Sequence, residues 1–109
     1  MVTHFTCPYL GGAVELTDER EQHIAANHPD LLPAYRWCIA EALTDPDQVR
    51  RSERFGNARL LSRWFSSVRD GKQVVVVVVT ETGVVNRHWI ITAYMARRLT
   101  GGEIEWQRN

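Results

Sequence analysis

The clearest hydrophobic pattern in the chain is a run of six valines at residues 74–79. β-Branched side chains disfavour a helix, and an uninterrupted apolar run is typical of a strand buried on both faces. The next apolar segment, residues 86–95, alternates, and alternate residues of a strand share a face. One face would carry His88, Ile90, Thr92 and Tyr94, and so would present the polar His, Thr and Tyr side chains. The two segments predict neighbouring strands, and the second presents both an apolar face and a reactive one.

Helical spacing dominates the chain before Pro46. Thr17 is predicted to cap a helix that ends by Asn27, because Pro29 disfavours helical geometry in the residue before it. Asp30 is predicted to cap a second helix, with Pro33 tolerated in its first turn, and Asp45-Pro46-Asp47 is predicted to end it. Its buried stripe consists of apolar residues three and four positions apart, namely Leu31, Tyr35, Cys38, Ile39, Ala42 and Leu43.

The period changes to two after Pro46, which predicts short strands at residues 48–52 and 58–65 and a last edge segment at residues 103–106. Connections this short favour an antiparallel meander and exclude parallel crossovers. The predicted fold class is therefore α+β, with two N-terminal helices packed on a roughly four-stranded antiparallel meander sheet.

The length predicts one domain, residues 1–109. Within it, residues 1–13 contain a proline and two glycines and are predicted to form an irregular arm. Residues 17–44 form the helical part, and residues 48–107 form the sheet part.

Composition places the chain among ordinary globular proteins, with 44% hydrophobic and 24% charged residues. No segment reaches the ~18 apolar residues of a membrane span, and the N-terminus lacks the pattern of a secretory signal. Two cysteines, Cys7 and Cys38, are too few for a disulfide framework. We therefore expect reduced thiols, a cytoplasmic location and no membrane partner.

The zero net charge hides a segregation of charge along the chain. Residues 1–49 hold two basic and eight acidic side chains, whereas residues 50–109 hold eleven basic and five acidic ones. A basic half favours binding of a polyanion such as RNA. The alternative is that acidic helices and an arginine-bearing sheet neutralise each other, and the charge pattern alone favours neither.

Known metal and serine-hydrolase motifs are missing. The four histidines, His4, His23, His28 and His88, do not form a His-Glu-x-x-His motif, and no Gly-x-Ser-x-Gly motif is present. Cys38 lies on the predicted core stripe, where a thiol is usually inert. We expect no metal site and no cofactor.

Cleavage of RNA without a metal needs only groups that transfer protons and groups that stabilise charge on the phosphate. Histidine transfers protons near neutral pH, and arginine binds phosphate through two parallel hydrogen bonds. The candidates are His23 on the first helix, Arg63 or Arg59 on the second strand, and the hydroxyl groups of Thr92 and Tyr94. Three of them have ordinary alternatives: His23 as a solvated helix residue, Thr92 as a strand former and Tyr94 as a core residue.

Three segments resemble a known family. The segment His23-Ile24-Ala25-Ala26-Asn27-His28-Pro29 is similar to an "HI…HP" signature, residues 42–49 resemble an "L.DP..V" transition from helix to strand, and the last long strand contains "TAY" at residues 92–94. These motifs resemble phage and mobile-element nuclease domains of the barnase–EndoU–colicin–RelE-like class. The resemblance extends from about Glu15 to Trp106.

The resemblance implies a metal-independent ribonuclease fold. We assign His23, Arg63, Thr92 and Tyr94 as candidate catalytic residues. Candidate substrate-binding residues are Arg59, His28 and His88; His28 has a structural alternative in ending the helix, and His88 has no clear counterpart in the family. Many RNA-cleaving toxins are strongly basic, whereas this chain is neutral. That departure favours a narrow substrate, a partner-dependent enzyme or one that has lost its activity.

The leading functional hypothesis is a prophage- or toxin-related ribonuclease-like domain that acts on tRNA or another structured RNA. One alternative is a non-catalytic RNA- or protein-binding module of the same fold. Another is a RelE/ParE-like toxin of a toxin–antitoxin pair. The predicted partners are RNA and an immunity or antitoxin protein, and pairing of exposed strand edges would give a homodimer.

Overall fold

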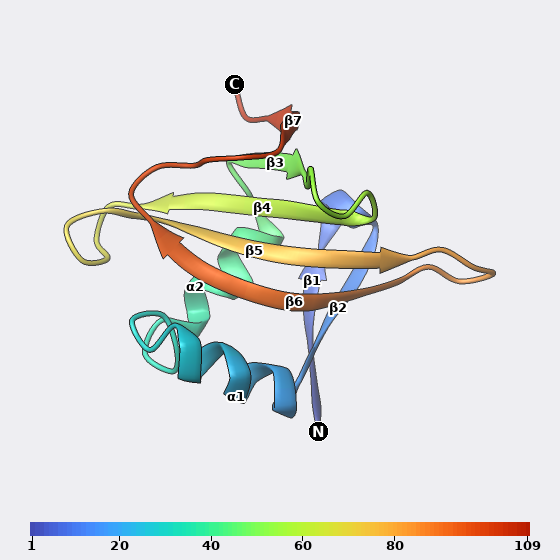
Figure 1. The fold of residues 1–109 in the computed structure, drawn as a ribbon, viewed down its shortest axis with the longest axis horizontal. Helices are drawn as coiled ribbons and strands as arrows, with labels where there is room; N and C mark the ends of the chain where they lie inside the picture. Colours follow the sequence, from blue (N-terminus) through green and yellow to red (C-terminus); the bar gives the residue numbers. More distant parts are fainter.

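The computed structural model describes residues 1–109 as two helices and a seven-stranded mixed sheet (Figure 1). This confirms the predicted α+β class. In chain order the elements are β1 (Val2–Cys7), the 3-10 helix η1 (Pro8–Leu10), β2 (Gly12–Thr17), α1 (Asp18–Asn27), α2 (Arg36–Thr44), β3 (Gln48–Arg51), β4 (Ala58–Phe65), β5 (Lys72–Glu81), β6 (Arg87–Ala96) and β7 (Glu103–Gln107). Neither helix is long and apolar enough to cross a membrane.

The strand order in the sheet is β1-β2-β6-β5-β4-β3-β7. The centre, β3 to β6, is the predicted antiparallel meander, and β7 is the predicted edge strand. The prediction of about four strands, all antiparallel, was wrong because β1 and β2 join the sheet at its other edge. β2 pairs with β6 in parallel, through Val14–His88 and Glu15–Trp89.

The prediction of an irregular arm at residues 1–13 was also wrong. β1 and β2 form an antiparallel hairpin joined by η1, so the helices are not strictly N-terminal. Phe5 and Cys7 alternate into the core, while Pro8 begins η1. Gly11 has a φ of 75°, in the left-handed region that favours glycine. The proline and glycines therefore mark one tight turn between two strands.

The first helix matches its prediction, and the second begins later than predicted. The Thr17 hydroxyl accepts a hydrogen bond from the backbone N–H of Arg20 at 3.1 Å, and α1 ends at Asn27. Residues 29–35 form turns, and α2 begins at Arg36. Pro29 and Pro33 have no N–H to donate, which explains why this segment does not continue a helix. The predicted stripe is nevertheless buried, apart from the partly buried Tyr35.

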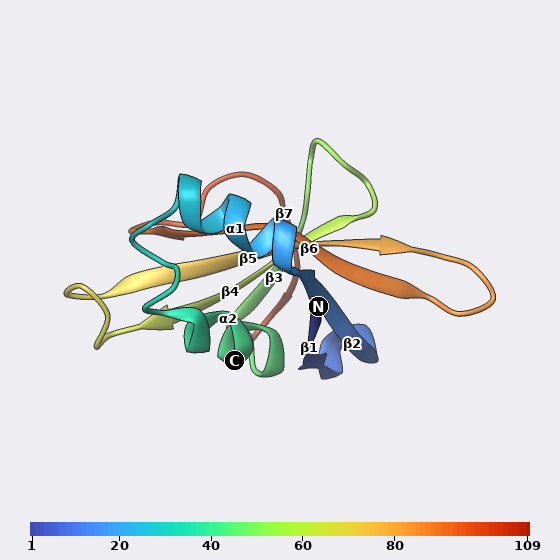
Figure 2. The same ribbon diagram turned by 90° about the horizontal axis from the view of Figure 1, so that it is seen from below.

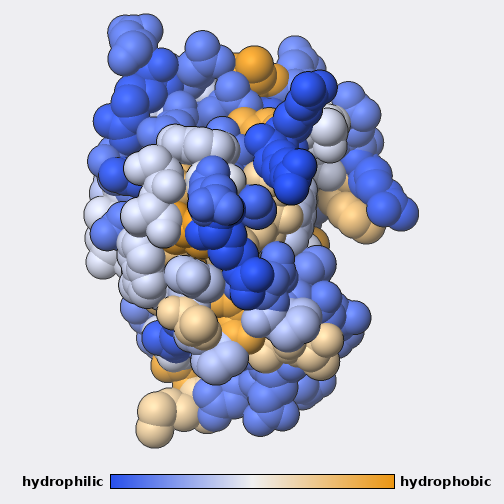
Figure 3. Space-filling model, turned by 90° about the vertical axis from the view of Figure 1, so that its left-hand side faces the viewer, coloured by the Kyte–Doolittle hydropathy of each residue, from blue (hydrophilic) through white to orange (hydrophobic).

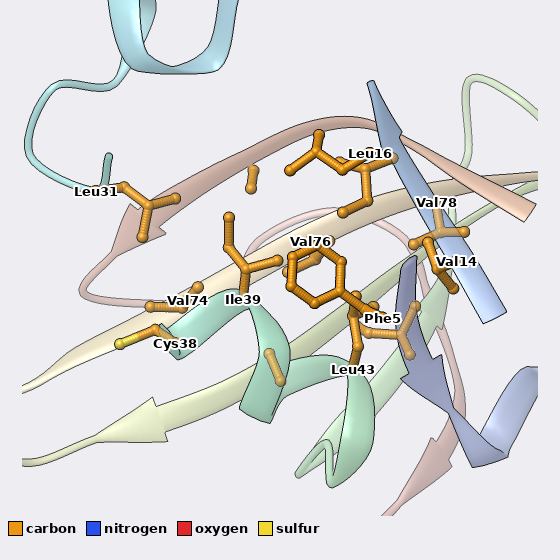
Figure 4. Packing of buried hydrophobic residues seen from close by; sticks show 14 of the residues in the cluster. Phe5, Val14, Leu16, Leu31, Cys38, Ile39, Leu43, Val74, Val76 and Val78 are labelled. Carbon is orange, nitrogen blue, oxygen red and sulfur yellow. The ribbon is translucent and has the colours of Figure 1, made fainter. Parts of the chain in front are cut away.

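The core lies between α2 and the sheet. Figure 4 shows Ile39 and Leu43 of α2 packed among Phe5 of β1 and the valines of β5. Alternate valines, Val74, Val76 and Val78, belong to this core, whereas Val75 and Val77 pack with Ala58 on the opposite face. The prediction that the valine strand is buried on both faces is confirmed. α1 lies next to β6 (Figure 2) and contributes Ile24 to the core.

A β-bulge in β6 overturns the predicted parity of that strand. Val77 is paired with Thr92 and Val78 with Ile90, so Ile91 is an extra residue. Ile90 packs in the main core on the face covered by the helices, and Tyr94 packs on the opposite face. His88 and Thr92 therefore do not share a face, contrary to the prediction.

Candidate functional site

The structure does not bring the four predicted catalytic residues together. His23 is exposed on α1, where the Asn27 amide donates a hydrogen bond to the His23 carbonyl oxygen at 2.9 Å. The hollow beside His23 is lined only by residues of α1 and its cap, Thr17. The one hydrogen-bond partner of this imidazole is the Asn27 amide of the same helix, 3.3 Å from Nε2.

Arg63, on β4, belongs to an ion-pair cluster. Its Nη1 donates to Asp45 Oδ2 at 2.8 Å, and the same carboxylate accepts from Arg108 near the C-terminus. Both guanidinium groups lower the pKa of Asp45. This arrangement ties the end of α2 to β4 and to the C-terminal segment.

Tyr94 lies at the C-terminal end of β6, beside His28, with the two ring centroids 6.1 Å apart. Thr92 precedes it on the same strand and is partly buried. We call this part of the sheet, with Arg63 on the neighbouring part of β4, the helix end. The surface at this side of the molecule is mostly hydrophilic, with hydrophobic residues in small patches (Figure 3).

A different polar cluster lies at the opposite end of the same strands, which we call the hairpin end because the β5–β6 hairpin begins there (Figure 1). A hollow of about 370 Å³ is formed there by η1, β4, β5, β6, β7 and the hairpin loop. Its lining residues are Tyr9, Leu10, Arg59, Thr80, Thr82, Asn86, His88 and Glu105. We call it the His88 hollow.

His88 is the buried titratable group of this hollow, with only 6% of its surface exposed. Its Nδ1 lies 2.8 Å from Thr80 Oγ1, and Nε2 has no hydrogen bond to another residue. Burial, and then the positive charge of Arg59, lower the pKa of His88. The imidazole is therefore neutral at pH 7, and when Nδ1 donates to Thr80 the Nε2 lone pair is available to accept a proton.

Glu105 joins Arg59 of the His88 hollow to Arg51, which lines a separate hollow with Glu105. It accepts hydrogen bonds from Arg59 Nε at 2.8 Å, from Arg51 Nη2 at 2.9 Å and from the Tyr9 hydroxyl. Burial opposes ionisation of this carboxyl, but the bonds from Tyr9, Arg59 and Arg51 outweigh burial and lower its pKa to about 2. Burial and the neighbouring carboxylate raise the pKa of Tyr9 to about 12. The carboxylate is thus ionised and the phenol protonated at neutral pH.

Strand register explains how these residues meet. Arg51 is paired with Arg59 across β3 and β4, and Thr80 is paired with His88 across β5 and β6. η1 then carries Tyr9 to β7, where its ring centroid lies 6.0 Å from that of Trp106. The hollow therefore exists only because the first hairpin meets the last strand.

Two of the predicted substrate-binding residues, Arg59 and His88, lie in this hollow, although no sequence pattern places them together. The prediction missed Tyr9, Thr80 and Glu105. No local motif marks these three, since Tyr9 and Glu105 are 96 residues apart. Their contact depends on the N-terminal hairpin, which was itself predicted to be irregular.

The segregated charges partly neutralise each other. Glu15 pairs with Arg87 at 2.8 Å, Asp45 with Arg63 at 2.8 Å, and Asp47 with Arg108 at 3.2 Å. Each pair joins the acidic half of the sequence to the basic half. No three His, Cys, Asp or Glu side chains gather as ligands for one metal ion.

Comparisons of the chain with protein-family models, with curated proteins and with solved structures found no match.

Proposed function

We propose that the chain is a metal-independent ribonuclease-like domain that cleaves RNA in the His88 hollow. The observation that carries the proposal is the pairing of a neutral imidazole with a guanidinium group in one open hollow. His88 Nε2 has no partner in the protein, and Arg59 is close enough for its charge to lower the His88 pKa. The imidazole can transfer a proton and the guanidinium group can stabilise charge on the phosphate, and cleavage of RNA without a metal requires both functions.

RNA supplies its own nucleophile, the 2′-hydroxyl group. In the proposed step, His88 Nε2 removes the proton from this hydroxyl as its oxygen attacks the adjacent phosphorus. The bond from phosphorus to the 5′-oxygen breaks, and that oxygen takes a proton from water in the open hollow. The products are a 2′,3′-cyclic phosphate and a 5′-hydroxyl, and His88 releases its proton to solvent. Thr80 acts as a positioning residue because it holds the imidazole through Nδ1.

Arg59 and Arg51 are proposed to bind the phosphate. In the free protein both donate to Glu105, so a phosphate oxygen must compete with that carboxylate. One carboxylate neutralises only one of the two guanidinium groups, which leaves a net positive charge for the phosphate. The zero net charge of the chain gives little non-specific attraction to RNA, so a narrow substrate such as tRNA or another structured RNA fits best.

The test is cleavage of tRNA and of a short oligoribonucleotide in EDTA, with analysis of the product ends. We expect cyclic phosphate products, and we expect His88→Gln to lower kcat/KM by about 100-fold or more. His23→Ala changes the exposed histidine of α1 and should alter the rate by less than about twofold. Intact RNA at high concentrations of folded protein would contradict the proposal, as would equal losses in the two variants.

A second candidate is a binding module of the same fold without turnover. The observation that favours it is that Glu105 already occupies both arginines and Tyr9 in the free protein. Salt-dependent binding of RNA without cleavage would support this candidate over the ribonuclease.

A further inference from the structure

A second hollow, of about 620 Å³, adjoins the His88 hollow. The two share Leu10, Asn86 and His88, so His88 stands between them. The rest of the second hollow is lined by residues 11–13 at the start of β2, by Val85 and Arg87 of the β5–β6 hairpin, and by His4 and Glu15.

The second hollow opens where β2 and β6 diverge. The parallel pairing of these strands begins at Val14–His88 and covers only two residue pairs. At Gly12 and Ala13 no strand is paired with β2 on the side of β6. Gly12 lies directly beside the imidazole, since a Cβ there would be in van der Waals contact with His88 Cδ2 at 3.9 Å.

The chemistry of this hollow differs from that of the His88 hollow. Arg87 donates to both oxygens of Glu15, at 2.8 and 3.1 Å, so its main charged groups form a neutral pair. Asn86 adds an amide, and Leu10 and Val85 add apolar surface. Neutral polar groups beside apolar ones fit a ribose and a base better than a second phosphate.

We infer that the second hollow binds the ribose and base of the nucleotide that supplies the 2′-hydroxyl. This inference rests on the proposed function. The phosphate lies in the His88 hollow, and His88 reaches the 2′-oxygen because it lines both hollows. The strand that crosses His88 must be single-stranded, since a base in a duplex stays stacked between its neighbours.

The test is a substitution that places a large side chain in the second hollow and leaves the lining of the His88 hollow unchanged. Ala13 lines only the second hollow, and Ala26 is an exposed alanine of α1 that lines neither. Ala13→Phe should raise KM for an oligoribonucleotide by about tenfold and leave kcat within about twofold, because it weakens binding rather than the chemical step. Ala26→Phe, the matched control, should change neither. The same variants are measured for binding of a 2′-O-methyl oligonucleotide, which cannot be cleaved.

The outcomes separate the inference from the proposed function. Cleavage by the wild-type protein with equal KM values in Ala13→Phe and Ala26→Phe would overturn the second hollow and leave the ribonuclease standing. Binding of the 2′-O-methyl strand that Ala13→Phe weakens, without cleavage of RNA by the wild type, would support the hollow and overturn catalysis. A protein that neither binds nor cleaves would overturn both.

Discussion

The two ends of the sheet carry the same kinds of side chain in different surroundings. At the hairpin end, Arg59, Thr80 and His88 line one hollow together with Tyr9. The helix end has Arg63, Thr92 and Tyr94, and α1 adds an exposed histidine, His23. In the first set, Thr80 is hydrogen-bonded to His88, and Tyr9 and Arg59 are both hydrogen-bonded to Glu105. No hydrogen bond joins the members of the second set.

The difference shows what turns polar residues into a candidate site. The Arg63 guanidinium group forms an ion pair with Asp45, and the His23 side chain is exposed to solvent. His88 is buried, with Nδ1 hydrogen-bonded to Thr80 and Nε2 without a hydrogen bond to another residue. Burial and the charge of Arg59 lower the pKa of His88. The two ends offer matched pairs of residues that test this comparison.

The largest expected difference is between the two arginines of β4. Arg59→Gln removes a proposed phosphate ligand and should lower kcat/KM for RNA by about 100-fold. Arg63→Gln, four residues along the same strand, should change it by less than about twofold. Steady-state cleavage rates measure both, with circular dichroism to check folding. A larger loss of kcat/KM in Arg63→Gln than in Arg59→Gln would contradict the proposal and would place the phosphate site at the helix end.

The two threonines should differ by a smaller factor. Thr80→Val removes the partner of His88 Nδ1 and should lower kcat by about tenfold, whereas Thr92→Val should be nearly neutral.

In the wild type, activity should rise with pH through the His88 pKa, which lies below its usual 6.5. Loss of the Thr80 hydroxyl removes an acceptor that favours the imidazolium, so the acidic limb of the pH–rate profile should move to lower pH. An unshifted profile would mean that Thr80 does not position His88.

A variant of Glu105 tests the contacts at the hairpin end through the free energy of unfolding and through phosphate binding. Glu105→Gln should lower the free energy of unfolding at pH 7 by about 1 kcal/mol, since the ion pairs are partly solvated. Because folding lowers this pKa from 4.5 to about 2, the stabilisation is present above pH 4.5 and is lost as the pH falls toward 2. Urea unfolding should show that loss in the wild type and not in the variant.

Glu103→Gln, an exposed change on the same strand, serves as the control for Glu105. The Glu105 variant should also bind inorganic phosphate more tightly, because its neutral amide competes less for Arg51 and Arg59. Weaker phosphate binding in Glu105→Gln would contradict the proposal that this carboxylate occupies the phosphate position.

The smallest expected effect separates two tyrosines. Tyr9→Phe removes the hydrogen bond to Glu105 and should destabilise the fold by about 0.5 kcal/mol. The Tyr94 hydroxyl makes no hydrogen bond to another residue, so Tyr94→Phe should be neutral. Thermal or urea unfolding of both variants measures the difference, and a reversed order would show that the Tyr9 bond contributes nothing.

The sequence predicts well what depends on neighbours along the chain. Thr17 caps α1, Pro29 follows its end, and the valine run forms a strand buried on both faces. These features follow from local hydrogen bonding and side-chain shape. The strands at the N-terminus were missed although Phe5 and Cys7 alternate, because Pro8 and the glycines outweighed that short pattern.

The candidate site depends on contacts that no local pattern encodes. The bulge at Ile91 arises from the register between β5 and β6, and it reverses the parity that placed His88 with Thr92. The contact between Tyr9 and Glu105 joins the first hairpin to the last strand. Residue types alone therefore predicted a plausible chemistry and a plausible list of groups, while the strand register selected a different set.

The most direct measurement of the central claim is an NMR titration of the imidazole nitrogens with a 2′-O-methyl oligonucleotide. His23 and His28 report on α1 and the helix end, and His88 reports on the hollow. We predict saturable shifts of the His88 nitrogens, with those of His23 and His28 unchanged. Shifts at His23 or His28 with none at His88 would contradict the account and place the ligand at the helix end.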